Sequence, residues 1–152
     1  MTQPKQIKVN AIKNGTVIDH IESGKAIKVL DILKLDGSQT VMMGINLHSK
    51  KLGSKDLIKI ENKELTSDEV NSIALISPDA SVTIIKDYNV AKKIKLEIPE
   101  YIEELVQCPN PKCITNLEKI SSKFKLTADE DVSVRCVYCE KKYRIDDVKV
   151  HI

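Results

Sequence analysis

Four cysteines occupy the last third of the chain in two closely spaced pairs, Cys108 with Cys113 and Cys136 with Cys139. Their pattern, C-x4-C-x22-C-x2-C, lets each of two turns offer two thiolates to one ion. Four thiolates complete the tetrahedral coordination of Zn²⁺ and leave no position for a reactive water. The spacing therefore predicts one structural zinc ion per chain rather than a catalytic one.

The same cysteines could instead form two disulfides or remain unrelated thiols. Residues 1–10 contain lysines but no apolar core of signal-peptide length, and no stretch reaches the roughly 18 apolar residues of a membrane span. We therefore expect a cytoplasmic chain with no membrane partner. Thiols stay reduced in that compartment, where paired cysteines more often bind metal.

The cysteines also divide the chain of 152 residues into two predicted domains, 1–98 without cysteine and 99–152 with all four. A domain of about fifty residues has too little core to be stable alone, and a bound metal compensates for this. The chain has no glycine-rich phosphate loop, and its three histidines have no catalytic sequence context. We predict no catalytic residues and no enzymatic activity of its own.

Strand and helix patterns alternate through the first domain. Strand patterns cover 7–12, 41–47, 55–61, 82–84 and 88–96, and helix patterns cover 24–36 and 66–77. We expect Ile27, Leu30 and Leu33 to share one face of the first helix, and Thr66 with Glu69 to form a capping box at the second. This order, βαββαβ with an added edge strand, predicts an α+β fold of the ferredoxin-like plan.

Short alternating segments around Phe124, Val134 and Tyr143 predict that the second domain is a small antiparallel β domain wrapped on the metal. This domain is electrically neutral, with nine basic and nine acidic residues from Tyr101 onward. Zinc domains that bind nucleic acid usually have a basic excess and stacking aromatics, and this chain has no Trp and one Phe. We expect a protein partner and no nucleic acid. A zinc-ribbon nucleic-acid-binding regulator and a stand-alone metabolite sensor remain the alternatives.

Two lysines of the third strand pattern have the spacing of a ligand site. Side chains alternate along a strand, so Lys55 and Lys59 share one side while Ile58 and Ile60 face the core. Their Cα atoms lie roughly 13 Å apart, so one ammonium group could meet a phosphate while the other reaches a sugar or base. They could equally be solvated charges that discourage aggregation of sheets.

Three features occur together in a fixed order: the segment GTVIDHI at 15–21, the segment KDLIKIEN at 55–62, and the cysteine pattern. Over about residues 6 to 150 the chain resembles the regulatory subunits of aspartate carbamoyltransferase. The resemblance implies a nucleotide-binding first domain, with CTP and UTP as inhibitors and ATP as activator of pyrimidine biosynthesis. It also implies that the zinc domain docks on the catalytic chain, and that three regulatory homodimers join two catalytic trimers in a dodecamer.

The resemblance further implies particular site residues. Those of the nucleotide site are Val9, Ala11, Ile12, Val17, Asp19, His20, Lys55, Lys59, Thr83, Tyr88, Val90 and Lys93. Among them, Lys93 is the implied phosphate contact and Asp19 the ribose contact, while the backbone at Ile12 and Tyr88 faces the base. The implied docking residues are Asn110, Lys112, Tyr138, Glu140 and Lys141. Thr83 and Lys112 each stand where the family pattern has asparagine.

Overall fold

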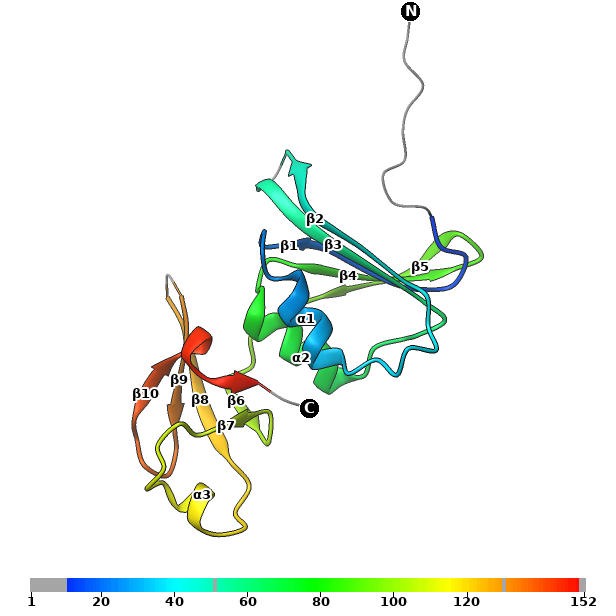
Figure 1. Ribbon diagram of the computed structural model, residues 1–152. Coiled ribbons are helices and arrows are strands. Elements are labelled where there is room, and N and C mark those ends of the chain that lie inside the picture. Colours follow the sequence, from blue (N-terminus) through cyan, green and yellow to red (C-terminus); the bar gives the residue numbers. More distant parts are fainter. Residues whose placement is uncertain (1–10, 51, 130, 151–152) are drawn as a thin grey trace, which may run out of the picture. The chain divides into compact units, whose positions relative to one another are not determined.

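The computed structural model describes residues 11–50, 52–129 and 131–150 (Figure 1). They belong to two compact units. The first comprises the chain up to Ile27 together with Leu35–Leu65 and Asp79–Lys95. The second comprises Lys28–Lys34, Thr66–Pro78 and the chain from Leu96 onward. No helix among the described residues is long and apolar enough to cross a membrane.

A five-stranded antiparallel sheet dominates the first unit, in the order β2-β3-β1-β4-β5 (Figure 1). Its strands are β1 (Gly15–Ile21), β2 (Val41–Ser49), β3 (Gly53–Glu61), β4 (Ser81–Lys86) and β5 (Asn89–Lys95). Ile18, Ile58 and Val82 are fully buried on one face. Their immediate neighbours in each strand, such as Val17, Lys59 and Thr83, are more exposed, because side chains alternate along a strand. The sheet therefore leaves its second face open to solvent.

The part of the chain that the structure describes contains two longer helices, α1 (Ala26–Leu33) and α2 (Ser67–Ile76). The capping box predicted for α2 is confirmed: the Glu69 amide donates to Thr66 Oγ1 at 3.2 Å, and the Thr66 amide donates to Glu69 Oε1 at 3.0 Å. This helix ends at Ile76, just before the Ser77-Pro78 stop signal. The observed element order from β1 to β4 is βαββαβ, and β5 adds the edge strand.

The first strand lies later in the chain than expected. Residues 7–10 of the predicted strand lie outside the described residues, and Ala11 and Ile12 belong to no strand, so the prediction is wrong for these two. The observed strand begins at Gly15, which has φ +142°. A Cβ there would lie 2.0 Å from the Ile60 carbonyl oxygen, so only glycine fits against β3. Asn14-Gly15 is thus an entry into a strand rather than a turn.

The predicted apolar face of α1 is also partly wrong. Ile27 is 58 % exposed, whereas Val29 and Ile32 are buried. The helix begins at Ala26, and its buried stripe runs through Ala26, Val29, Ile32 and Leu33 at helical spacing. Leu30 is half-buried beside this stripe. Apolar residues at helical spacing begin at both Ala26 and Ile27, and the structure buries the set that begins at Ala26.

Short strands form the cysteine-containing part of the second unit, as predicted. A four-stranded sheet has the order β10-β9-β8-β6, and a two-stranded sheet pairs β11 with β7. The elements are β6 (Tyr101–Glu103), β7 (Val106–Gln107), α3 (Ile114–Leu117), β8 (Lys123–Ala128), β9 (Val132–Cys136), β10 (Lys142–Arg144), the 3₁₀ helix η1 (Ile145–Asp147) and β11 (Lys149–Val150). Phe124, Val134 and Val106 are fully buried in its core together with Leu75 of α2.

Candidate functional site

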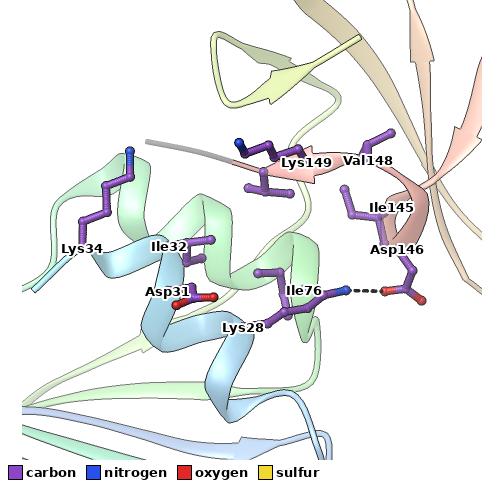
Figure 2. Close-up of a pocket in the computed structure, with 10 residues that line it drawn as sticks. Lys28, Asp31, Ile32, Lys34, Ile76, Ile145, Asp146, Val148 and Lys149 are labelled. Atoms are coloured by element: carbon purple, nitrogen blue, oxygen red, sulfur yellow. Dashed lines mark ion pairs between the residues drawn. The ribbon is translucent and has the colours of Figure 1, made fainter. Parts of the chain in front are cut away.

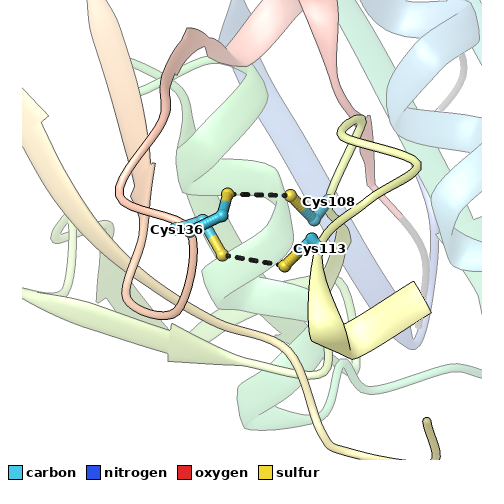
Figure 3. Close-up of side chains that lie close together, drawn as sticks. Cys108, Cys113 and Cys136 are labelled. Carbon is cyan, nitrogen blue, oxygen red and sulfur yellow. Dashed lines mark hydrogen bonds between the residues drawn. The ribbon is translucent and has the colours of Figure 1, made fainter. Parts of the chain in front are cut away.

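The four cysteines converge as their spacing predicted. Their Sγ atoms all lie within 4.8 Å of one another, and three of the four residues are buried. Figure 3 shows Cys108 and Cys113 on one loop facing the turn that carries Cys136. Cys108 and Cys139 have their sulfurs 3.7 Å apart, and so do Cys113 and Cys136. These separations are far longer than the roughly 2.05 Å of a disulfide bond, and all four thiols are free.

The arrangement fits a tetrahedral zinc ion. Four Zn–S bonds of about 2.3 Å at tetrahedral angles place neighbouring sulfurs about 3.8 Å apart. The observed distance of 3.7 Å matches this value closely. Cys108, Cys113, Cys136 and Cys139 are therefore the residues that would hold the ion. With four thiolates as ligands, the bound metal would link two loops and would supply no open coordination position.

Local hydrogen bonds shape the two loops that carry the cysteines. In the first loop, the Cys113 amide donates to the Asn110 carbonyl at 3.0 Å. Asn116 braces this loop, because its Nδ2 donates to the carbonyls of Cys108 (2.8 Å) and Asn110 (2.7 Å). In the second loop, the Cys136 amide donates to the Lys141 carbonyl at 3.0 Å. The role of Asn116 had no signal in the sequence, since it depends on how the loop folds.

Burial and hydrogen bonding act in opposite directions on the thiols. Burial raises the pKa of Cys108 to about 12. Burial also disfavours the thiolate of Cys113, but several hydrogen bonds together outweigh it and lower the pKa to about 7. The Thr115 hydroxyl, 3.2 Å from the sulfur, and the Thr115 amide contribute most, followed by Cys136 and Cys108. A coordinated zinc ion deprotonates its thiol ligands, so its binding at neutral pH releases protons, chiefly from groups such as Cys108.

Most predicted nucleotide-site residues lie on the open face of the five-stranded sheet. Strand register aligns Lys59, Val17, Thr83 and Lys93 in one row across β3, β1, β4 and β5. Directly opposed residues of antiparallel strands point to the same side, so these four side chains share a face. A lysine stands at each end of the row and small side chains lie between. The structure thus brings together residues that are 76 positions apart in sequence, from Val17 to Lys93.

A second polar group lies beside this row. Lys55 Nζ is 2.8 Å from Asp19 Oδ1, and His20 Nδ1 is hydrogen-bonded to Ser81 Oγ at 3.1 Å. Burial opposes ionisation of Asp19, but the hydrogen bonds from Lys55 and from the His20 amide dominate and lower its pKa below 3.8. Asp19 is thus a carboxylate at neutral pH. Sequence reasoning missed Ser81, although it lies two positions from Thr83 on the same face of β4.

The remaining predicted nucleotide residues lie near one end of β1. The Tyr88 amide donates to the Lys13 carbonyl at 2.9 Å, which holds the β4–β5 turn beside the segment that contains Ala11 and Ile12. Tyr88 is 66 % exposed and Val90 is exposed, whereas Ile12 is buried. Val9 lies outside the described residues.

A cavity of about 540 Å³ lies within the second unit (Figure 2). Isoleucine and valine side chains line it together with a rim of charged residues, and Lys28 forms an ion pair with Asp146 across part of that rim at 3.6 Å. None of the predicted nucleotide, metal or docking residues lines this cavity. The open face of the sheet therefore remains the candidate site on chemical grounds.

The predicted docking residues gather around the two cysteine loops. Lys112, Glu140 and Lys141 are exposed and Tyr138 is 46 % exposed, while the Asn110 side chain accepts a hydrogen bond from the Lys112 amide at 3.1 Å. Three exposed apolar residues that sequence reasoning missed lie in the same loops or beside them: Ile114, Leu117 and Val137. No feature of the surrounding sequence indicated that these three apolar side chains are exposed.

Comparison with known proteins identifies the family of this chain. Residues 7–97 match the model of the aspartate carbamoyltransferase regulatory chain, allosteric domain, and residues 100–149 match that of its metal binding domain. A regulatory chain of this name from Pyrococcus abyssi is 46 % identical over 150 residues, covering 97 % of this chain and 99 % of its own length. One from Methanococcus vannielii is 51 % identical over 136 residues, covering 90 % and 92 %. The chain belongs to the aspartate carbamoyltransferase regulatory chain family, with an allosteric domain followed by a metal-binding domain that fits one structural zinc ion.

Proposed function

We propose that this chain binds nucleotide effectors on the open face of its five-stranded sheet and passes the effect of binding to a catalytic partner. The observation that carries the proposal is the row of Lys59, Val17, Thr83 and Lys93, which lies beside the Lys55–Asp19 pair. At about 4.8 Å per strand, the row spans roughly 14 Å between its end Cα atoms. The row has a cation at each end and small side chains between them, and a carboxylate lies beside it. This distribution of charge and this length match a nucleoside triphosphate.

Each part of the effector has a candidate contact. Lys93 is exposed and, among the described residues, has no ion pair, so its ammonium group is available to a phosphate. The Asp19 carboxylate, held ionised by Lys55, can accept hydrogen bonds from ribose hydroxyls. The backbone at Ile12 and Tyr88 is the proposed contact of the base. CTP and UTP as inhibitors and ATP as activator are the effectors we propose.

Calorimetric titration with CTP, UTP and ATP tests this site. We expect Lys93→Gln to weaken binding about tenfold, because a charged hydrogen bond to phosphate contributes on the order of 1.5–3 kcal/mol. Lys92→Gln is the matched control, since Lys92 pairs with Ile84 and points to the opposite face of the sheet. Equal loss of affinity in both variants would indicate general electrostatics, and unchanged affinity in Lys93→Gln would reject the site.

We further propose that the zinc domain docks on the catalytic chain of aspartate carbamoyltransferase. The exposed apolar residues Ile114, Leu117 and Val137 beside Lys141 and Glu140 support this, because such a mixture of apolar and charged side chains is typical of a protein interface. In this proposal the regulatory chain has no catalytic activity. Its coupling to the partner arises from different affinities of nucleotide for the two states of the complex.

A homodimer of regulatory chains is part of the same proposal. Strand β2 is at an edge of the sheet, and Met43 and Ile45 on it are exposed apolar residues, as is Ile27 of α1, which supports contact with a second copy in this region. Three such dimers would join two catalytic trimers. Native mass spectrometry of regulatory chain mixed with catalytic trimers tests this stoichiometry, and a regulatory chain that stays unbound would reject it.

The ferredoxin-like plan, the domain limits 1–98 and 99–152 and a cytoplasmic location complete the proposal. The strand order β2-β3-β1-β4 supports the plan. The boundary is supported by the family matches, which end at residue 97 and resume at residue 100. Expression of each domain alone, followed by zinc and nucleotide binding assays, tests the boundary.

A further inference from the structure

The outward face of the four-stranded sheet carries an uninterrupted basic row. Strand register aligns Tyr101, Lys125, Arg135 and Lys142 across β6, β8, β9 and β10. Opposed residues in antiparallel strands point to the same side of the sheet, and all four of these side chains are exposed. The residues beside them in sequence, such as Phe124, face the buried core. The four strands lie side by side in Figure 1.

The three cations of this row are unpaired within the part of the chain that the structure describes: none of Lys125, Arg135 and Lys142 has an ion pair there. The cations in the neighbouring rows differ, because Lys123 pairs with Glu103 at 3.6 Å and Arg144 with Asp131 at 3.9 Å. Adjacent strands are about 4.8 Å apart, so the unpaired charges follow one another at close range. Such an arrangement costs repulsion unless an anionic partner covers it.

The neutral composition of this domain had argued against such a surface. Its nine acidic residues balance nine basic ones, but the structure separates the two signs. Most of the carboxylates lie outside the four-stranded sheet, in turns and in η1, where Asp146 and Asp147 are found. A count of charges could not reveal this separation, because it depends on strand register.

We propose that this basic row is a second docking surface, and that it binds a carboxylate-rich face of the catalytic chain next to the region that contacts the cysteine loops. The inference rests on the proposed function. Position supports it: Arg135 and Lys142 are paired across β9 and β10, at the base of the loop that carries the proposed docking residues Tyr138, Glu140 and Lys141. The row therefore begins beside the second cysteine loop and runs from there across the sheet.

A nucleic acid is the less suitable occupant of the row. Single strands gain affinity by stacking bases on exposed aromatic rings. Tyr101 is the aromatic residue of the row, and Lys123 Nζ lies over its ring at 5.1 Å from the centroid. That contact covers one face of the ring, and no second aromatic residue of the row lies beside it for stacking. The row therefore offers three cations and a single, partly covered ring, which favours carboxylates of a protein over stacked bases.

The kinetics of complex assembly test the inference. Full-length regulatory chain would be mixed with catalytic trimers at low and high salt, and the association rate measured by stopped-flow light scattering. We expect the double variant Arg135→Glu, Lys142→Glu to associate at least about tenfold more slowly at low salt, because complementary charge accelerates encounter and salt screens it. The milder Arg135→Gln, Lys142→Gln variant should show a smaller change in the same direction.

The matched control is Lys119→Glu, Lys149→Glu, which alters the net charge equally with exposed lysines outside the row. It should associate within about twofold of the wild-type rate. Bound zinc and nucleotide affinity should be unchanged in every variant, which excludes misfolding. If the row variants associate at the wild-type rate at all salt concentrations, the docking role of the row is rejected and the proposed function stands. Failure of the wild-type chain to assemble would overturn the proposed function as well.

Salt-dependent binding of a single-stranded RNA oligonucleotide, lost in the row variants while assembly stays normal, would assign the row to nucleic acid instead.

Discussion

At the scale of single residues, position in the sheet decides what each side chain contributes. Asp56 illustrates this: it is fully buried, and its carboxylate accepts hydrogen bonds from the amides of Gly24, Ala26 and Asn46 at 2.8–3.0 Å. Its neighbour Lys55 points to the opposite face and pairs with Asp19. Adjacent residues of β3 thus serve the interior and the proposed nucleotide face separately, because side chains alternate along a strand.

Replacement of Gly15 by any larger residue should strongly destabilise the fold. A Cβ at this position would lie 2.0 Å from the Ile60 carbonyl oxygen, which belongs to the backbone and cannot rotate away. We expect Gly15→Ala to lower the free energy of unfolding by more than about 2 kcal/mol, measured by urea denaturation. Gly37→Ala is the control, since it also has positive φ but no atom within 4 Å, and should cost about 1 kcal/mol. Equal losses would contradict the steric explanation.

Asp19 should make stability depend on pH in a defined direction. Its pKa is lowered in the folded chain, so its contribution is present above the unfolded-state pKa and is lost as the pH falls through the lower folded-state value. Asp19→Asn should therefore reduce stability at pH 7 by about 0.5–1 kcal/mol, since the Lys55 pair is partly exposed. The difference from wild type should begin to shrink below about pH 4, near the unfolded-state pKa, and vanish once the pH is below the lower folded-state pKa. A difference that persists at acidic pH would show that the substitution acts through packing.

At the scale of elements, the two cysteine loops depend on side chains that are not ligands. Asn116 closes the first loop with two hydrogen bonds to backbone carbonyls. We expect Asn116→Ala to weaken zinc binding about tenfold, in the range found when groups that orient metal ligands are removed. Competition with a chromogenic chelator measures the change. Leu117→Ala, on the exposed side of the same short helix, should retain wild-type affinity, and a similar loss there would point to unfolding of α3.

The sequence predicted elements better than it predicted their edges and faces. Strong periodic or capping signals succeeded, as for Thr66 with Glu69, and the cysteine spacing identified the metal ligands. The first strand failed because Asn-Gly usually forms a turn, and only the close approach of Ile60 reveals why glycine is needed there. The row that joins Lys59 to Lys93 and the basic row through Arg135 could not be predicted, because both depend on pairing between strands distant in sequence.

At the scale of the whole molecule, the two sites should lose function in a fixed order when zinc is removed. The cysteine loops depend on the metal, whereas the proposed nucleotide face is built from strands that contain no cysteine. Titration of the assembled complex with a mercurial should therefore release the regulatory chain from its partner before nucleotide binding declines. Sedimentation velocity and nucleotide titration on the same samples follow the two events. Loss of nucleotide binding ahead of dissociation would contradict this order.

The central claim is that nucleotide binding on the sheet is coupled to assembly with the catalytic chain. Calorimetric titration of CTP into the regulatory chain, alone and within the complex, tests it most directly. Coupling between two equilibria is reciprocal, so a nucleotide that shifts the complex between states must bind with different affinity when the chain is assembled. We predict saturable binding in both samples with unequal Kd values. Absence of binding in both samples, or identical Kd values, would contradict the account.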